Sequence, residues 1–243
     1  MMFATPAAPR TRIKICGLTR EADVDAAVQA GADAVGFVMY APSPRGISPE
    51  WAATLARRLP PFVTPVLLFV NEEPQTVLAA WKQVPGAALQ FHGDETAAAC
   101  FAASGGGARP YLRAARIPLG DPAGFDLLEF VSTHSSAQAI LLDAFVEGFG
   151  GGGKAFDWSR LPPSVNCHLV LSGGLTPANV TDGILQVRPR CRSLAVDVSS
   201  GVEADGPGNK GIKDAGKINR FVAAVRAADT QLAQSPHVLL PTA

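Results

Sequence analysis

Residues 12–31 read RIKICGLTREADVDAAVQAG and contain one complete strand–turn–helix unit. The apolar run RIKIC predicts a strand over residues 12–16, and a glycine opens the turn that follows it. After the turn, apolar side chains recur every three or four residues until Gly31, which is typical of a helix and its end. Cys16 stands where the strand ends, so an oxidisable side chain lies at the open end of the unit rather than behind it.

The same alternation repeats along the chain at intervals of roughly 20 to 30 residues. Helix-like stretches separate the apolar runs; one of them opens with Ser48 as cap and Pro49 at the first helical position, and another repeats this opening with Thr176 and Pro177. The runs are nearly continuous, as expected of strands buried on both faces of a parallel sheet. The seven further predicted strands are AVGFVM (34–39), TPVLLFV (64–70), AALQF (87–91), PYLRAA (110–115), AILLD (139–143), HLVLS (168–172) and SLAVDV (193–198).

Eight strand–helix repeats predict an α/β fold, a single (β/α)8 TIM barrel, with a doubly wound open sheet as the alternative. The sixth repeat is irregular, because residues 147–157 read EGFGGGGKAFD, so we expect a glycine-rich loop to replace part of the sixth helix. The predicted organisation is a flexible N-terminal extension at residues 1–11, a catalytic barrel domain at 12–226 and a flexible C-terminal tail at 227–243.

The composition narrows the possible partners. The 243 residues are 47% hydrophobic and 17% charged, which suits a large folded core. Lys plus Arg and Asp plus Glu number 21 each, so no overall basic field would gather nucleic acid or an anionic membrane. We expect neither as a partner, and no apolar run approaches the ~20 residues of a membrane span. The four cysteines and four histidines are scattered, which predicts no metal site and a cytoplasmic location.

In barrels of this kind the chemistry lies at the carboxyl ends of the strands. The turns SGG (172–174) and SSG (199–201) follow the seventh and eighth predicted strands. Such turns let backbone N–H groups approach an anion, and loops in these two places often hold phosphate. We expect a phosphate site there, with two ordinary tight turns as the alternative.

Other strand ends carry groups that can move a proton or hold a charge. Asp143 follows an apolar run and is read as an acid or as a cap of the next turn. Cys16 reads by composition as a buried apolar residue, although its place beside Gly17 at the open end of a strand weakens that reading. Gln90 and His92 mark the end of the fourth predicted strand. His92 is an acid, a base or a structural histidine. Arg45, on the loop after the second strand, is a solvated charge or a carboxylate clamp.

Seven segments resemble, in their residues and in their order along the chain, segments of phosphoribosylanthranilate isomerases, the barrel enzymes of tryptophan biosynthesis. The resemblance covers residues 12–226, and departures such as Gly46 and Phe91 touch neither the acid nor the base. The segments are KICGLT (14–19), DAVGFVMYAPSPRGIS (33–48), LPPFVTPVLLFVNE (59–72), LQFHGDE (89–95), ILLDAF (140–145) with GGGGKAFDW (150–158), LVLSGGLTPANV (169–180) and AVDVSSGVE (195–203).

This resemblance implies a cofactor-free Amadori rearrangement of N-(5-phosphoribosyl)anthranilate to 1-(2-carboxyphenylamino)-1-deoxyribulose 5-phosphate. It implies that Asp143 is the general acid, Cys16 the general base and Arg45 the ligand of the anthranilate carboxylate. An unperturbed thiol, with a pKa of about 8.5, is already a few per cent ionised at neutral pH. The implied phosphate ligands are Gly173, Gly174, Ser199, Ser200 and Gly201, with Gln90, His92 and Asp197 as supporting residues.

Two other functions are alternatives to the one that the resemblance implies. A barrel isomerase of histidine biosynthesis is one alternative, although such enzymes carry an aspartate where this chain has Cys16. A non-catalytic barrel that binds a phosphorylated metabolite is another. The glycines at 150–153 are read as a mobile cover over the substrate. The enzyme is expected to be a monomer or a homodimer.

Overall fold

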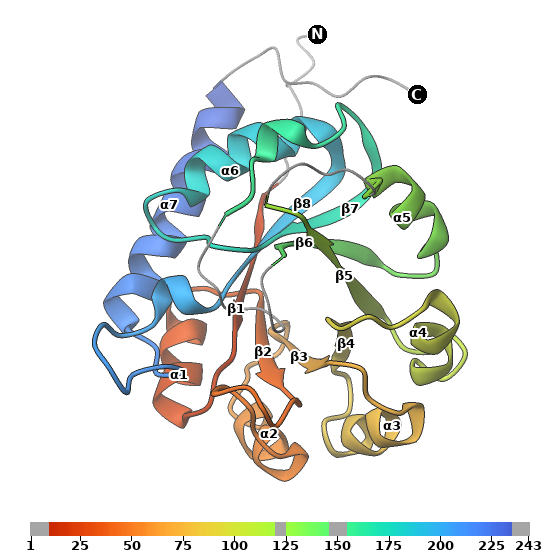
Figure 1. The fold of residues 1–243 in the computed structure, drawn as a ribbon. Helices are drawn as coiled ribbons and strands as arrows, with labels where there is room; N and C mark the ends of the chain where they lie inside the picture. The colour runs from red at the N-terminus through yellow and green to blue at the C-terminus, as the bar shows by residue number, and fades with distance from the viewer. Residues whose placement is uncertain (1–9, 120–124, 146–154, 235–243) are drawn as a thin grey trace, which may run out of the picture.

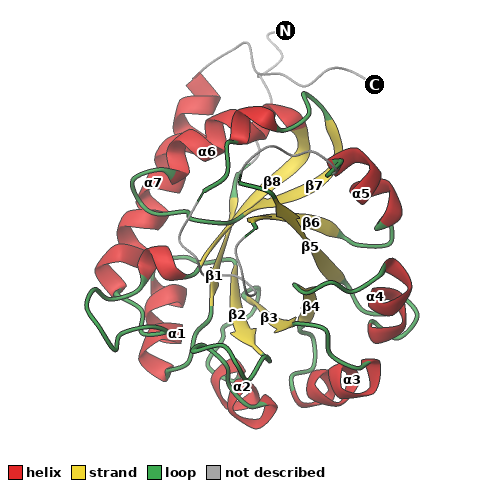
Figure 2. Ribbon diagram, in the orientation of Figure 1, coloured by secondary structure: helices red, strands yellow, loops and turns green. Residues whose placement is uncertain are grey.

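Eight parallel strands close into a barrel, and helices surround it (Figures 1 and 2). The computed structural model describes residues 10–119, 125–145 and 155–234. Each strand pairs with the next and β8 pairs with β1, so the predicted closed barrel is confirmed and the open sheet is excluded. The strands are β1 (Arg12–Cys16), β2 (Ala34–Val38), β3 (Thr64–Phe69), β4 (Ala88–Phe91), β5 (Tyr111–Ile117), β6 (Ala139–Ala144), β7 (Val165–Leu171) and β8 (Cys191–Val198).

The helices follow the strands in the predicted order. In α2 the Ser48 hydroxyl accepts a hydrogen bond from the backbone N–H of Trp51 at 3.2 Å, and Pro49 is the first helical residue, as predicted. The α-helices are α1 (Glu21–Gln29), α2 (Pro49–Ala56), α3 (Pro74–Gln83), α4 (Ala97–Ala103), α5 (Leu127–Thr133), α6 (Val180–Val187) and α7 (Ala215–Gln234). The 3-10 helices are η1 (Trp158–Arg160), η2 (Arg188–Arg190) and η3 (Ser200–Val202).

Alternate residues of each strand face opposite sides of the barrel wall. On β1, Ile13 and Ile15 join the large core between the strands and the helices, where both are fully or almost fully buried. Cys16 belongs to a second, smaller cluster with Val38 and Leu68 of β2 and β3. The β1 pattern therefore separates apolar packing on the outside from chemistry on the inside.

Two connections differ from the simple repeat. Between β6 and β7, the described residues form η1, whereas the glycines at 150–153 lie outside the described residues. The helix expected to open at Thr176 begins at Val180 instead. The Asn179 side chain accepts a hydrogen bond from the Thr176 N–H at 2.8 Å and donates one to the Gly174 carbonyl at 3.0 Å. These bonds hold the preceding residues in a turn and delay the start of the helix.

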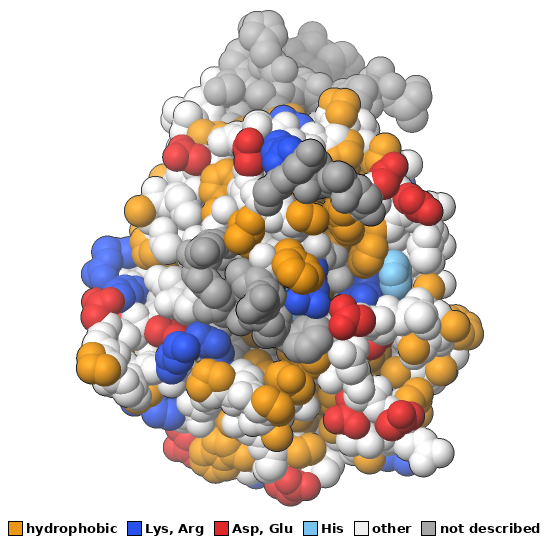
Figure 3. Space-filling model, viewed as in Figure 1, with side chains coloured by type: hydrophobic (Ala, Val, Ile, Leu, Met, Phe, Trp, Pro, Cys, Tyr) orange, Lys and Arg blue, Asp and Glu red, His pale blue; other side chains and the backbone are white. Residues whose placement is uncertain are grey.

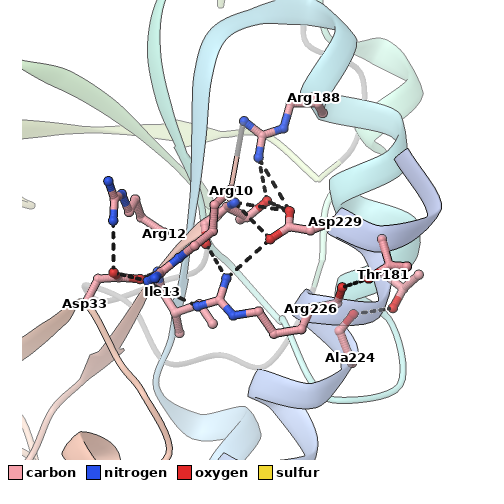
Figure 4. Close-up of polar contacts among 11 residues, drawn as sticks. Arg10, Arg12, Ile13, Asp33, Thr181, Arg188, Ala224, Arg226 and Asp229 are labelled. Atoms are coloured by element: carbon pink, nitrogen blue, oxygen red, sulfur yellow. Dashed lines mark hydrogen bonds and ion pairs between the residues drawn. The ribbon is translucent and has the colours of Figure 1, made fainter. Parts of the chain in front are cut away.

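The last helix runs past the predicted domain boundary. The boundary at residue 226 falls inside α7, which continues to Gln234. Asp229 accepts a hydrogen bond from the Thr11 N–H at 3.0 Å, and Arg226 donates to the Thr11 carbonyl at 2.8 Å (Figure 4). The apolar stripe weakens after residue 225, so the extension depends on polar contacts that the sequence pattern does not reveal. Residues 1–9 and 235–243, the rest of the predicted extensions, lie outside the described residues.

None of the helices in the described ranges has both the length and the apolar character to cross a lipid bilayer.

Candidate active site

The candidate residues gather at the carboxyl ends of the strands, as the barrel topology requires. Cys16 ends β1, Asp143 is the penultimate residue of β6, and Asp197 is the penultimate residue of β8. Figure 3 shows one face of the molecule, where basic and acidic side chains lie near the middle among apolar ones. The other candidates are Gln90 in β4, His92 directly after it, Arg45 between β2 and α2, Gly173 and Gly174 after β7, and Ser199, Ser200 and Gly201 after β8.

Cys16 lies beside a buried ion pair. The Nζ atom of Lys14 is 2.9 Å from the Oδ1 atom of Asp197, and β1 and β8 are paired so that these two residues are opposite each other. A Cβ atom at Gly36 of β2 would lie 2.7 Å from the Cys16 Sγ atom and 3.0 Å from the Lys14 Nζ atom. A glycine at this place in β2 therefore leaves room for both side chains.

The charges around Cys16 oppose its burial. Burial raises the pKa of the Cys16 thiol, and Asp197 raises it further, whereas Lys14 and then Lys213 lower it; the net shift is upward. Burial lowers the pKa of Lys14, but the charges of Asp197 and Cys16 outweigh burial and raise it overall, so Lys14 stays an ammonium ion. The thiol is thus less ionised than an unperturbed cysteine, because the neighbouring cations offset only part of the effect of burial.

Asp143 is held by a histidine and by the backbone. Its Oδ2 atom lies 2.9 Å from the Nε2 atom of His92, and its Oδ1 atom accepts the Ala144 N–H at 3.0 Å. The Nδ1 atom of His92 lies 3.1 Å from the Nε2 atom of Gln90, a fully buried residue of β4. The structure thus joins three predicted site residues in one chain of contacts, Gln90–His92–Asp143.

The loop that carries His92 is fixed from outside the barrel. Arg113 of β5 donates hydrogen bonds to the carbonyls of Phe91 and Gly93, both at 3.1 Å. Arg113 is buried and forms an ion pair with buried Glu95 at 3.2 Å. These two carbonyls flank His92 in the sequence, so Arg113 holds the backbone on both sides of the histidine.

Arg45 is buried and paired rather than solvated. Its Nε and Nη2 atoms donate to the two carboxylate oxygens of Glu203 at 2.6 and 3.0 Å. Lys213 also donates to Glu203, at 3.0 Å, and to the Ser199 carbonyl at 3.1 Å. Burial would raise the pKa of Glu203, but the hydrogen bond from Arg45 and the charge of Lys213 outweigh burial and lower it. The result is a buried cluster of two cations and one carboxylate.

The two candidate phosphate turns lie against each other. Gly173 and Gly174 have φ angles of 74° and 65°, the left-handed region that glycine adopts without strain. A Cβ atom at Gly201 would lie 1.9 Å from the Leu175 carbonyl oxygen, so the turn after β8 packs directly on the turn after β7. A Cβ atom at Gly17 would lie 2.6 Å from the Cδ atom of Arg45 and 3.1 Å from the Ser199 hydroxyl. The guanidinium residue and the serine turn are therefore neighbours.

Sequence reasoning missed four residues of this site, namely Lys14, Gly36, Glu203 and Lys213. Lys14 carries a usable signal, because it lies two residues before Cys16 on the same strand and must face the same side. Glu203 ends the segment AVDVSSGVE but carries no charge pattern that points to Arg45.

The chain is similar to known proteins over nearly its whole length. A family model described as N-(5'phosphoribosyl)anthranilate (PRA) isomerase matches residues 13–224. The N-(5'-phosphoribosyl)anthranilate isomerase of Methylibium petroleiphilum is 64% identical over 226 residues, which make up 93% of this chain and 99% of that relative.

Two solved structures resemble the fold. One is phosphoribosyl anthranilate isomerase in complex with reduced 1-(o-carboxyphenylamino)-1-deoxyribulose 5-phosphate, with 36% identity, a TM-score of 0.70, and coverage of 89% of this chain and 99% of that one. The other, with 35% identity and the same TM-score and coverage, shows mutually generated monomers of the dimeric phosphoribosylanthranilate isomerase of Thermotoga maritima. On the family match and the 64% identity, the chain belongs to the N-(5'-phosphoribosyl)anthranilate isomerase family of tryptophan biosynthesis.

Proposed function

We propose that this isomerase converts N-(5-phosphoribosyl)anthranilate to 1-(2-carboxyphenylamino)-1-deoxyribulose 5-phosphate with Asp143 as general acid and Cys16 as general base. The observation that carries the assignment is the placement of these groups at the same end of the barrel, each beside its own polar neighbour. His92 contacts Asp143, and Lys14 lies beside Cys16. Two separate proton carriers suit a rearrangement that begins with a protonation of the ring oxygen and a deprotonation at C2.

The acid acts first. Asp143 donates its proton to the ring oxygen of the ribose, the bond between C1 and that oxygen breaks, and an iminium ion forms. The hydrogen bonds among Gln90, His92 and Asp143 can rearrange when Asp143 loses its proton. With Asp143 ionised, Gln90 Nε2 donates to His92 Nδ1 and the ring's Nε2–H donates to the carboxylate. With Asp143 protonated, its O–H donates to Nε2, and Gln90 presents Oε1 to Nδ1–H.

The base acts second. The Cys16 thiolate removes the C2 proton of the iminium ion, and the electron pair forms the enolamine. Loss of the enol hydroxyl proton and addition of a proton at C1 then give the ketone, so the proton count balances. The positive iminium favours the thiolate beyond what Lys14 supplies, which suits a thiol whose pKa burial raises in the free enzyme. The reaction requires no cofactor.

Binding uses the two anionic ends of the substrate. The turns at Gly173–Gly174 and 199–201 offer backbone N–H groups to the phosphate. The cluster of Arg45, Lys213 and Glu203 carries one surplus positive charge, which suits the anthranilate carboxylate. The relative solved with a reduced product analogue supports this class of ligand. Holding both ends supplies positioning, a large part of the acceleration that an enzyme gives.

We further propose that the enzyme is a cytoplasmic homodimer. The four free cysteines suit a reducing compartment. Phe62, between α2 and β3, is fully exposed and has a φ angle of 73°. A fully exposed ring is available to pack against a second copy of the chain. The description of the Thermotoga maritima relative as dimeric supports this assembly.

The proposed reaction is tested by the loss of phosphoribosylanthranilate fluorescence with the wild type, Cys16→Ser and Asp143→Asn. We expect wild-type turnover and a loss of several orders of magnitude in each variant. Cys167→Ser, at a half-buried cysteine on β7, is the matched control and should keep its activity. Tight binding of a reduced product analogue without any wild-type turnover would instead favour the non-catalytic barrel. Full activity of Cys16→Ser would remove Cys16 as the base.

A further inference from the structure

We propose that Lys14 is a positioning residue that sets the ionisation of the Cys16 thiol, and that Asp197 keeps Lys14 charged while opposing the thiolate. The proposal deepens the proposed function, since it rests on Cys16 as the general base. It assigns a purpose to a buried ion pair inside the barrel, next to the candidate base.

The geometry brings the three groups together. Lys14 and Cys16 are two residues apart on β1, so both face the barrel interior, and Asp197 faces Lys14 from β8 at 2.9 Å. All three residues are at most 5% exposed. The Sγ and Nζ atoms both lie within 3.0 Å of one point beside Gly36. The thiol and the ammonium are therefore neighbours across a space that a larger residue on β2 would fill.

Burial strengthens the electrostatic interaction between Lys14 and the Cys16 thiolate. At a given distance a charge interaction is stronger inside a protein than in water, because the effective dielectric constant is lower, so an ammonium ion beside a buried thiol stabilises the thiolate effectively. A buried lysine alone would tend to lose its proton, because burial disfavours the charged form. Asp197 prevents this by pairing with Lys14. The pair therefore keeps a charged ammonium group beside the thiol, while the carboxylate of Asp197 opposes the thiolate.

The other charged groups near Cys16 are less well placed for this task. Lys213 faces the thiol from the segment after η3, but it donates to Glu203 and to the Ser199 carbonyl. Arg45 packs on Gly17, next to Cys16, and the Nε and Nη2 atoms of its guanidinium donate to Glu203. Glu203 therefore offsets part of the charge of both cations. Lys14 lies beside Cys16, with its Nζ atom and the Cys16 Sγ atom both next to Gly36, and its charge lowers the pKa of the thiol more than that of Lys213 does.

The test is the pH dependence of Cys16 alkylation by iodoacetamide, measured in the full chain by mass spectrometry of the Cys16 peptide. For Lys14→Met we expect the alkylation profile to move to higher pH, with at least a tenfold lower rate at pH 7, equal to a pKa change of about one unit. For Asp197→Asn we expect the opposite direction, since the variant removes the negative charge that opposes the thiolate, and the thiolate itself then becomes the counterion that keeps Lys14 charged. The double variant Lys14→Met/Asp197→Asn removes both charges and should lie between the single variants.

The opposite signs separate this proposal from a purely structural role. If the Lys14–Asp197 pair only stabilises the fold, both single variants should shift the pH profile of Cys16 alkylation in the same direction. That result would overturn the proposal. A Lys14→Met profile equal to that of the wild type would overturn it too. If Lys14→Met fails to fold, the double variant and Asp197→Asn still provide the comparison. Alkylation needs no turnover, so an inactive wild type with shifted profiles would refute the proposed reaction and leave this inference standing.

Discussion

The Nε2 atom of His92 lies 2.9 Å from the Oδ2 atom of Asp143, and both side chains are buried. A carboxyl group that must donate a proton and later recover it needs a partner that tolerates both states. An imidazole does so, because one ring nitrogen can donate or accept according to the tautomer. We therefore propose that His92 supports Asp143 in both of its protonation states.

We expect His92→Ala to lower kcat by about 10- to 100-fold, less than Asp143→Asn, because general acid catalysis as a whole contributes roughly 10²–10⁴-fold. The KM should change little, since His92 lies at the acid and not at the proposed anion sites. Steady-state fluorescence kinetics measure both constants. His168→Ala is the control, because His168 is exposed and bonds Ser193 on the wall of the barrel. An unchanged kcat in His92→Ala would show that Asp143 works without this partner.

The strand ends could be predicted from the sequence, but most partners at those ends could not. Apolar runs bounded by turns locate Cys16 and Asp143, because a parallel strand buried on both faces has a distinctive composition. The ion pairs could not be predicted from local patterns, because Lys14 and Asp197 are 183 residues apart and Arg45 and Glu203 are 158 residues apart. Barrel closure decides which of these side chains meet. The end of α7 was missed for a similar reason, because Asp229 bonds Thr11 at the start of β1.

The cluster around Glu203 gives a prediction for stability and for substrate binding. Glu203→Gln leaves two buried cations without their shared carboxylate, which should lower the free energy of unfolding by about 3 kcal/mol. It also removes the bidentate pair that fixes the orientation of the Arg45 guanidinium, so the substrate carboxylate should bind less well and the KM should rise. Urea denaturation and steady-state kinetics measure the two effects. Asp205→Asn is the control, because Asp205 is exposed and pairs only at the surface with Lys217. A stability loss as small as that of the control would contradict the buried cluster.

A histidine outside the barrel predicts how stability depends on pH. His134 is buried against the Phe130 ring, with the ring centroids 4.4 Å apart. Burial, and then the charge of Arg113, lower the pKa of His134 from 6.5 to about 4. Between these values the unfolded chain binds a proton that the folded chain does not, so stability rises with pH across this window. Acidification from pH 6.5 to pH 4 should thus cost on the order of 3 kcal/mol through this residue.

Replacing His134 removes its contribution to the pH dependence of stability. We expect the free energy of unfolding of His134→Leu to fall less steeply between pH 6.5 and pH 4 than that of the wild type, as measured by urea denaturation at several pH values. His168→Leu, which alters an exposed ring, serves as the control and should keep the wild-type slope. Equal slopes for His134→Leu and the wild type would mean that His134 is protonated as easily in the folded chain as in the unfolded one.

Substitutions at Phe62 should affect the proposed dimer and the stability of the single chain differently. Its backbone lies in the left-handed region, which costs a phenylalanine roughly 1–2 kcal/mol but costs glycine almost nothing. Phe62→Gly relieves this strain and adds freedom to the unfolded chain, which offsets roughly 0.5–1 kcal/mol of the gain. The stability of the monomer should therefore stay level or rise slightly. The loss of the exposed ring should at the same time weaken the dimer.

Sedimentation velocity across a range of micromolar concentrations distinguishes these effects. We expect the wild type to sediment as a dimer, and Phe62→Gly and Phe62→Asp to shift toward the monomer with unchanged or higher unfolding midpoints for the glycine variant. Leu128→Ser, at another exposed apolar residue in α5, is the matched control and should remain dimeric. A dimer that persists in both Phe62 variants would place the interface elsewhere. A monomeric wild type would overturn the proposed dimer, because the fully exposed Phe62 ring would then have no second copy of the chain to pack against.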